Sequence, residues 1–415
     1  MKKVLVGFMT GLLCVMPAAG VMAEDAAAET TNEAQAGTEA ANEAGETTAE
    51  GEGVQTGAQA LSDDIYSFQA EIDGEVYQFP MSYGEFTEKG WTYDGDAAQT
   101  MEPEQYTTAE TFKKDSSKLY ATIFNLGMNT VPFSECQIGG FSVDSYMMKD
   151  SAFSVKLPKG IEFGVSTLED VKAAYGEPSR EYDGEMYTAL TYEYETYQDV
   201  EIQVDKETKV VSKIDMRNII ETASEEEKAQ AETAVSDEVT AEVKSYQAPT
   251  ELGDDLTKFI VEYDGALYQM PAPVSEFEKN GWTVKEDQSD MTVKGKDSGW
   301  VSLMKNNQEL RVMARNYGDN ATTIRNCFVT TVKGDDNSTD MPITVQKGIT
   351  RGMTKADLEK ALEGVTYEFE ESDMFEYYTV EGPESSLDSV QILVRKDTSV
   401  VQAIEVSYMP RELAK

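Results

Sequence analysis

Residues 61–91 read LSDDIYSFQAEIDGEVYQFPMSYGEFTEKGW, and residues 252–282 read LGDDLTKFIVEYDGALYQMPAPVSEFEKNGW. At an offset of about 191 residues, the two stretches share acidic, aromatic, glycine and proline positions. Self-similarity at a fixed period indicates duplicated structural units. The sequence therefore predicts two tandem homologous domains. The identical positions in the first copy are Leu61, Asp63, Asp64, Phe68, Glu71, Asp73, Gly74, Tyr77, Gln78, Pro80, Glu85, Phe86, Gly90 and Trp91.

The rest of the chain divides around these two copies. We expect domain one at 61–220 and domain two at 249–415, each long enough to bury its own core. Residues 221–248 form an acidic, alanine-rich linker, for which a solvated helical spacer is the alternative to an irregular chain. Residues 24–60 contain no basic and no aromatic residue, so this segment is expected to be disordered.

Local patterns predict the elements of each domain. Residues 68–79 alternate apolar and polar side chains around Asp73-Gly74, which is typical of a hairpin with a tight turn. Two capping boxes, Ser82 with Glu85 and Ser166 with Glu169, each predict the start of a short helix. Alternating strands are expected at 200–204, 210–216, 390–394 and 400–406. These elements predict an α+β fold in which short helices pack on an antiparallel sheet in each domain.

The composition excludes several classes of function. The formal net charge is -42, which argues against binding to nucleic acid, because phosphates require a basic surface. The chain has no histidine, so Ser-His-Asp and Cys-His catalysis and histidine-ligated metals are excluded. No loop has the spacing of a calcium-binding EF-hand, so we interpret the carboxylates as solvated and expect no cofactor and no metal.

The first 23 residues have the pattern of a secretory signal peptide. Lys2 and Lys3 precede the apolar run 4–15, and Val21-Met22-Ala23 presents small residues before a cut at Glu24. Cys14 makes a lipid anchor the alternative to simple cleavage. Leu13 argues against that alternative, because a lipobox has Gly or Ala before its cysteine. No second apolar stretch is long enough to span a bilayer. We therefore expect a secreted protein, with a cell-surface tether as the alternative.

Cys136 and Cys327 are the cysteines that remain after such a cut, and they occupy equivalent places in the two copies. Two interpretations stay open for them. A small buried strand residue that was duplicated with its domain is the favoured one. A disulfide between the domains is the other, because an exported protein leaves the reducing cytosol.

Few residues are candidates for chemistry or binding. Glu85 and Glu276 recur in both copies, but capping accounts for Glu85 and duplication for Glu276. The loop 335–340 gathers Asp335, Asp336, Asn337 and Asp340, which is either solvated or a weak cation site.

The recurring aromatic residues Trp91, Trp282, Tyr77 and Tyr268 are expected in the cores, with a sugar-binding platform as the alternative. Trp300 has no aromatic counterpart in the first copy, so it is the leading candidate for an exposed contact.

Two stretches carry family resemblances. Residues 160–178 read G-x-x-x-G-x-S-T-x-E-D-V-x-x-x-Y-G-x-P, and with the strands that follow they resemble the β-lactamase-inhibitor-protein-like fold. Small lipoproteins of outer-membrane assembly share that fold. The second copy departs from the motif because no proline follows Gly364. In the inhibitor-like proteins the concave face of the sheet grips a partner, so the resemblance implies such a surface but no catalytic residue.

The opening of each domain has a second resemblance. The pattern F-x-x-x-x-D-G-x-x-Y-x-x-P, followed by E-F-x-x-x-G-W, is similar to modules of secreted proteins and lipoproteins from anaerobic Gram-positive bacteria. We therefore expect a non-enzymatic binding protein of the cell exterior, whose partner is an extracellular protein or glycan. Two copies would raise avidity for a repeated target. An enzyme that uses carboxylates or a metal and an inhibitor of an extracellular enzyme are the alternatives.

Overall fold

The computed structural model describes residues 60–150, 153–383, 385 and 387–413. The expected signal peptide and residues 24–59 of the expected disordered segment lie outside these residues. Within them, buried apolar side chains form two clusters, one drawn from residues 65–216 and one from residues 256–406. We refer to these parts as the first and second repeat and describe each by itself.

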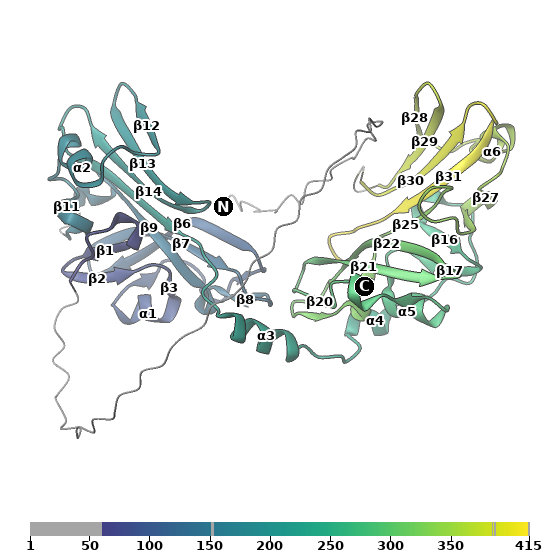
Figure 1. Ribbon diagram of the computed structural model, residues 1–415, viewed down its shortest axis with the longest axis horizontal. Coiled ribbons are helices and arrows are strands. Elements are labelled where there is room, and N and C mark those ends of the chain that lie inside the picture. The colour runs from purple at the N-terminus through teal and green to yellow at the C-terminus, as the bar shows by residue number, and fades with distance from the viewer. Residues whose placement is uncertain (1–59, 151–152, 384, 386, 414–415) are drawn as a thin grey trace, which may run out of the picture. The chain divides into compact units, whose positions relative to one another are not determined.

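The first repeat is built mainly from antiparallel strands (Figure 1). Its strands are β1 (Gln69–Ile72), β2 (Glu75–Gln78), β3 (Met81–Ser82), β4 (Thr92–Tyr93), β5 (Thr100–Met101), β6 (Gln105–Lys114), β7 (Ser117–Asn125), β8 (Val131–Pro132), β9 (Gln137–Asp144), β10 (Val155–Leu157), β11 (Ile161–Glu162), β12 (Arg180–Asp183), β13 (Tyr187–Glu195), β14 (Gln198–Asp205) and β15 (Val211–Asn218). Its helices are α1 (Tyr83–Glu88) and α2 (Leu168–Tyr175), with 3-10 turns η1 (Ile65–Ser67), η2 (Phe133–Glu135), η3 (Met147–Asp150) and η4 (Pro158–Gly160).

These strands form a large sheet with a smaller one. The large sheet has nine strands in the order β12-β13-β14-β15-β9-β7-β6-β4, with β3 paired to β9. The small sheet has the order β11-β10-β1-β2. Side chains from the small sheet and from α1 and α2 share one buried cluster with alternate residues of the large sheet. One face of the large sheet is therefore covered, and the strand residues between the buried ones face the other side.

The second repeat has the same order of main strands and helices, apart from some 3-10 turns and the division of one long strand into two. Its strands are β16 (Ile260–Tyr263), β17 (Ala266–Gln269), β18 (Ala272–Pro273), β19 (Thr283–Val284), β20 (Thr292–Val293), β21 (Ser298–Lys305), β22 (Gln308–Arg315), β23 (Thr322–Thr323), β24 (Phe328–Val329), β25 (Thr331–Gly334), β26 (Ile343–Val345), β27 (Ile349–Thr350), β28 (Glu368–Glu371), β29 (Phe375–Glu381), β30 (Ser389–Arg395) and β31 (Val400–Ser407). Its helices are α5 (Val274–Lys279) and α6 (Lys355–Ala361), with 3-10 turns η5 (Leu256–Lys258), η6 (Glu286–Gln288), η7 (Ile324–Asn326) and η8 (Gln346–Gly348).

One local difference separates the two sheets. In the first repeat β9 is a continuous strand that pairs with β7 on one side and with β15 on the other. Gly140 of β9 adopts a φ of 152°, and a bulge lies beside it. A Cβ at this position would lie 1.9 Å from the carbonyl oxygen of Met216. The second repeat has Thr331 at the equivalent place, and there the strand is interrupted, so that β24 and β25 belong to separate five-stranded sheets. A β-branched residue cannot occupy the site of Gly140, which accounts for the interruption.

The expected α+β class is wrong. Strands make up 42% and helices 19% of the described residues, so each repeat is β-rich. The predicted capping boxes mark helices of only six to eight residues, and most other helical segments are single 3-10 turns. The helices are too short to cover a whole sheet face, so the strands of the small sheet cover the rest of it. This is why each repeat has more strand than helix.

Several predicted elements are confirmed. Residues 68–79 form the β1–β2 hairpin, in which Asp73 and Gly74 both have positive φ. Ser82 and Glu85 form the predicted capping box of α1. The box of α2 lies one residue later than expected, at Thr167 and Asp170, because the Ser166 hydroxyl accepts a hydrogen bond from the Glu162 backbone instead.

The stretch between the repeats contains two helices, α3 (Glu225–Thr233) and α4 (Ala241–Ser245). α3 buries none of its residues, as a solvated helical spacer would. Tyr246, which follows α4, instead packs against the core of the second repeat and accepts a hydrogen bond from the Gln269 backbone at 3.0 Å. The last part of the expected linker is therefore a structural part of the second repeat.

Candidate functional site

Trp300 lies on the outer face of the β21–β22 hairpin in the second repeat. Its side chain is 41% exposed, and Met313, which pairs with it across the two strands, is equally exposed. The guanidinium of Arg311 lies 5.8 Å from the centre of the indole ring. Trp300, Arg311 and Met313, which we call the Trp300 patch, place an aromatic ring, a thioether and a cation together on one surface.

The equivalent surface of the first repeat is a hollow of ≈ 450 Å³. Ala109 occupies the place of Trp300 in a bulge of β6, and Thr122 occupies the place of Met313. Small side chains therefore line the hollow where the second repeat has large ones. Tyr120 and Ser142 lie across from one another on β7 and β9 and also line it.

Ion pairs line the hollow, both within β15 and between β14 and β15. Arg217 donates to the Asp199 carboxylate at 2.6 Å, and Lys213 lies 3.0 Å from Asp215 and 3.3 Å from Glu201. Burial alone would lower the pKa of Lys213, but the attraction of the two carboxylates outweighs it and raises the pKa. Lys213 is therefore charged at neutral pH. In the second repeat, uncharged residues stand at the equivalents of Lys213, Arg217, Asp199 and Glu201.

The recurring aromatic residues lie in the cores. Trp91 is 2% and Trp282 3% exposed, and each packs against a phenylalanine of the preceding helix. The indole nitrogen of Trp91 donates to the hydroxyl of Tyr77 at 3.0 Å, and Tyr268 is fully buried. This burial excludes these four side chains from a sugar-binding platform, which requires exposed rings.

The recurring carboxylates have structural roles. Glu85 accepts hydrogen bonds from the backbone and hydroxyl of Ser82, and these bonds lower its pKa. A lowered pKa is the opposite of what a general acid requires. Glu276 forms an ion pair with Lys279 one helical turn away, at 2.7 Å.

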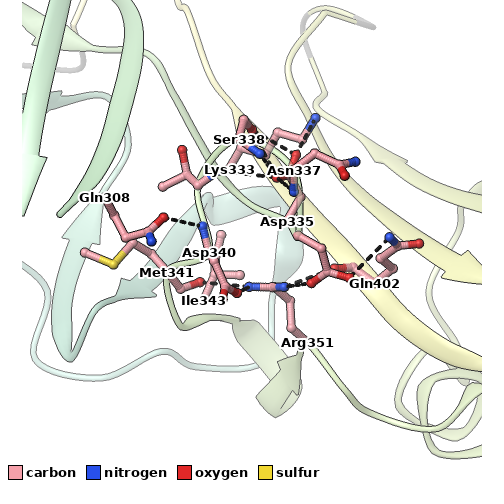
Figure 2. Close-up of polar contacts among 12 residues, drawn as sticks. Gln308, Lys333, Asp335, Asn337, Ser338, Asp340, Met341, Ile343, Arg351 and Gln402 are labelled. Carbon is pink, nitrogen blue, oxygen red and sulfur yellow. Dashed lines mark hydrogen bonds and ion pairs between the residues drawn. The ribbon is translucent and has the colours of Figure 1, made fainter. Parts of the chain in front are cut away.

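The loop 335–340 is a closed polar network rather than an open cation site (Figure 2). Asp335 accepts hydrogen bonds from the backbones of Asn337 and Ser338 at 2.8 and 2.6 Å, and Lys333 lies 3.2 Å from its carboxylate. Burial alone would raise the pKa of Asp335, but the backbone bonds outweigh it and lower the pKa to about 2.

The remaining carboxylates of this loop are bound to one arginine. Arg351 pairs with Asp340 at 2.7 Å (Figure 2). It also pairs with Asp336 and donates to the Gln402 carbonyl. The protein's own cations and amides therefore occupy the oxygens that a metal would need. Among the described residues, no group of three or more acidic or cysteine side chains could hold a metal ion.

Cys136 and Cys327 are free, buried thiols at equivalent turns. Each thiol lies near a backbone carbonyl four residues earlier, that of Pro132 or Thr323. Burial raises the pKa of Cys136 to about 12 and raises the pKa of Cys327 as well. Both side chains are therefore neutral at physiological pH.

Comparison with protein-family models, curated proteins and solved structures finds no match for this chain. Across the residues that the structure describes, none of the helices has the length and apolar character needed to cross a bilayer. The functional argument therefore rests on the chain's own surfaces.

Sequence reasoning singled out Trp300 but missed the hollow of the first repeat. A signal for the hollow was present, because Asp199, Glu201, Lys213 and Arg217 occupy the polar positions of two alternating strands. Comparing the polar strand positions of the two copies would have identified these residues, since the second copy has uncharged ones there.

Proposed function

We propose that this chain is an exported, non-enzymatic binding protein whose repeats contact a partner through the uncovered faces of their sheets. The observation that carries the proposal is the Trp300 patch. Exposed Trp300 and Met313 side chains lower solubility, and neither contributes to the buried core. Trp, Met and Arg are enriched at protein interfaces.

A comparison of the two copies supports this proposal. The inward-facing positions of the long strands stay apolar in both repeats, whereas the outward-facing positions differ in size and charge. Core packing constrains the first set, and the second set is free to change with the bound partner. We therefore propose that the two faces recognise different chemical groups, which replaces simple avidity for one repeated target.

The partner class is an extracellular protein or a glycan. An aromatic ring with an adjacent guanidinium suits a protein side chain or the apolar face of a sugar. An inhibitor of an extracellular enzyme is a special case of this proposal, and its support is the resemblance to folds that grip a partner with the sheet. The recurring carboxylates do not support an enzyme, because capping and ion pairing use them.

Photo-crosslinking from position 300 tests this proposal. The full chain would carry a photoreactive phenylalanine analogue in place of Trp300, and the matched control would carry it at Tyr146, which is 85% exposed but outside any strand. We expect a discrete crosslinked species on intact producing cells from position 300 and not from position 146. Mass spectrometry would then distinguish a protein from a glycan. The same products from both positions would refute the proposal.

Affinity for the partner so identified gives the second measurement. A tryptophan at the centre of an interface contributes about 2 kcal/mol or more, so Trp300→Ala should weaken binding about 30-fold. Tyr146→Ala should leave binding unchanged.

A further inference from the structure

A pocket in the second repeat has walls of aromatic rings and a buried carboxylate. Its volume is ≈ 460 Å³, within the range of small-ligand sites. The walls come from the edge of the repeat's core, from the stretch around α4 and from the residues that follow β31. Phe259, Phe328, Tyr408 and Tyr246 supply the rings, and Asp388 supplies the carboxylate.

Asp388 is the unusual group in this pocket, because its side chain is only 4% exposed. Its Oδ1 accepts a hydrogen bond from the Met409 backbone at 2.9 Å. In the described part of the chain, no cation pairs with Asp388 and no donor binds its Oδ2. A buried carboxylate without a cationic partner carries a large desolvation cost, which a bound cation would offset.

The rings stand close to this carboxylate. Phe259 and Tyr408 stack with their centres 4.5 Å apart. A Cβ on Gly382 would lie 2.9 Å from the Asp388 Cβ and 3.0 Å from the Phe259 Cζ, so these two side chains adjoin the same point. Gly382 permits this approach because it has no side chain. An aromatic wall beside a carboxylate is the arrangement that recognises an organic cation, through ring faces and charge together.

The first repeat has Phe68 at the place of Phe259, but it lacks the carboxylate and the tyrosine at the equivalent positions. Gln198 stands in place of Asp388, and Asn218, which donates to the Phe79 carbonyl at 2.9 Å, stands in place of Tyr408. Tyr66 stands in place of Thr257 and its ring packs 5.5 Å from that of Tyr194. Asp388 and Tyr408 of the pocket are therefore particular to the second copy.

We propose that this pocket binds an alkylammonium group. Asp388 pairs with the ammonium, and the stacked rings of Phe259 and Tyr408 cover its alkyl part. Glu242 and the exposed Lys258 also line the pocket. Two carboxylates and one ammonium leave the lining with one net negative charge. The net charge of -42 draws cations toward the protein as a whole. The group comes either from a free amine or from a lysine side chain of a peptide.

Titration with defined probes tests the proposal. The probes are n-butylammonium for the free amine and N-acetyl-lysine methylamide for the lysine side chain, with n-butanol as the neutral control. Met270 is among the residues that line the pocket, so the shift of its labelled methyl group in an NMR spectrum reports occupancy in the full chain. We expect a saturable shift with at least one of the two amines and none with butanol. The amine that binds identifies the source of the group.

Two variants and one control locate the effect. Asp388→Asn keeps an acceptor for the Met409 backbone but removes the charge, and it should weaken amine binding at least 10-fold. Asp287→Asn changes the net charge equally at an exposed position and should bind as the unmodified chain does. Thr257→Tyr restores the aromatic residue of the first copy and should block the pocket without a change of charge. Equal amine binding by the chain and by Asp388→Asn or Thr257→Tyr, or equal binding of butanol, would overturn the proposal.

Discussion

Replacing Gly140 by alanine should destabilise the first repeat far more than the same change at Gly160. Both glycines have positive φ, 152° and 79°, so both substitutions incur a backbone penalty of about 1–2 kcal/mol. The two positions differ in the room that surrounds an added Cβ. Nothing lies within 4 Å of a Cβ at Gly160, whereas a Cβ at Gly140 would lie 1.9 Å from the Met216 oxygen.

The overlap between this Cβ and the Met216 oxygen determines how much stability the Gly140 variant loses. An ordinary contact requires well over 3 Å, so β15 would have to move by more than 1 Å, and overpacking of this kind costs a further 1–3 kcal/mol. We expect Gly140→Ala to lower the free energy of unfolding by about 2–5 kcal/mol and Gly160→Ala by about 1–2 kcal/mol. With a urea dependence of about 2 kcal/mol per molar, the unfolding midpoint of the first repeat should fall by roughly 1–2.5 M for Gly140→Ala.

Urea unfolding followed by hydrogen exchange and mass spectrometry measures this effect in the full chain. Exchange protection should fall in β7, β9 and β15, which meet at Gly140, and should persist in the strands of the second repeat. Equal midpoint shifts for the two variants would show that close approach does not limit this position. Loss of protection in the second repeat would contradict the description of two separate cores.

Two further predictions concern buried groups. Because the pKa of Asp335 is lowered to about 2, its contribution to stability is complete above the unfolded value of about 4 and is lost as the pH falls from 4 to 2. Asp335→Asn should therefore reduce the pH dependence of the second repeat's unfolding in that window by about 1–2 kcal/mol, whereas Asp287→Asn should not, and parallel pH profiles would contradict the assignment. For Cys136 and Cys327, burial keeps the thiols protonated, so alkylation by iodoacetamide at pH 8 should be slow in the folded chain and complete after denaturation. A disulfide-linked pair of peptides in the non-reduced digest would contradict this expectation.

Local chemistry made parts of the fold predictable. Asp73-Gly74 specifies a turn with positive φ, and Ser82 with Glu85 closes a capping box, so the hairpin and helix could be derived from a few adjacent residues. The fold class could not, because long strands such as β6 bury only one of their ten residues and show no alternation in sequence. Their strand conformation comes from pairing with β7, which is a tertiary effect.

The candidate sites could likewise be predicted from the sequence only in part. Trp300 could be singled out because one copy has it and the other has no aromatic counterpart. The hollow requires β6, β7, β9, β14 and β15 to be brought side by side, and the burial of Asp388 requires the residues after β31 to fold back over Phe259. Neither juxtaposition is encoded by spacing along the chain.

The alternation of side chains along these strands has a consequence for inheritance. Every second codon of β14 or β30 specifies the interior, and the codons between them specify the face in solution. A mutation at an outward position changes what the surface offers while the packed layer beneath keeps its shape. After duplication, one copy could therefore keep an ancestral surface while the other acquired a new one, without either having to refold.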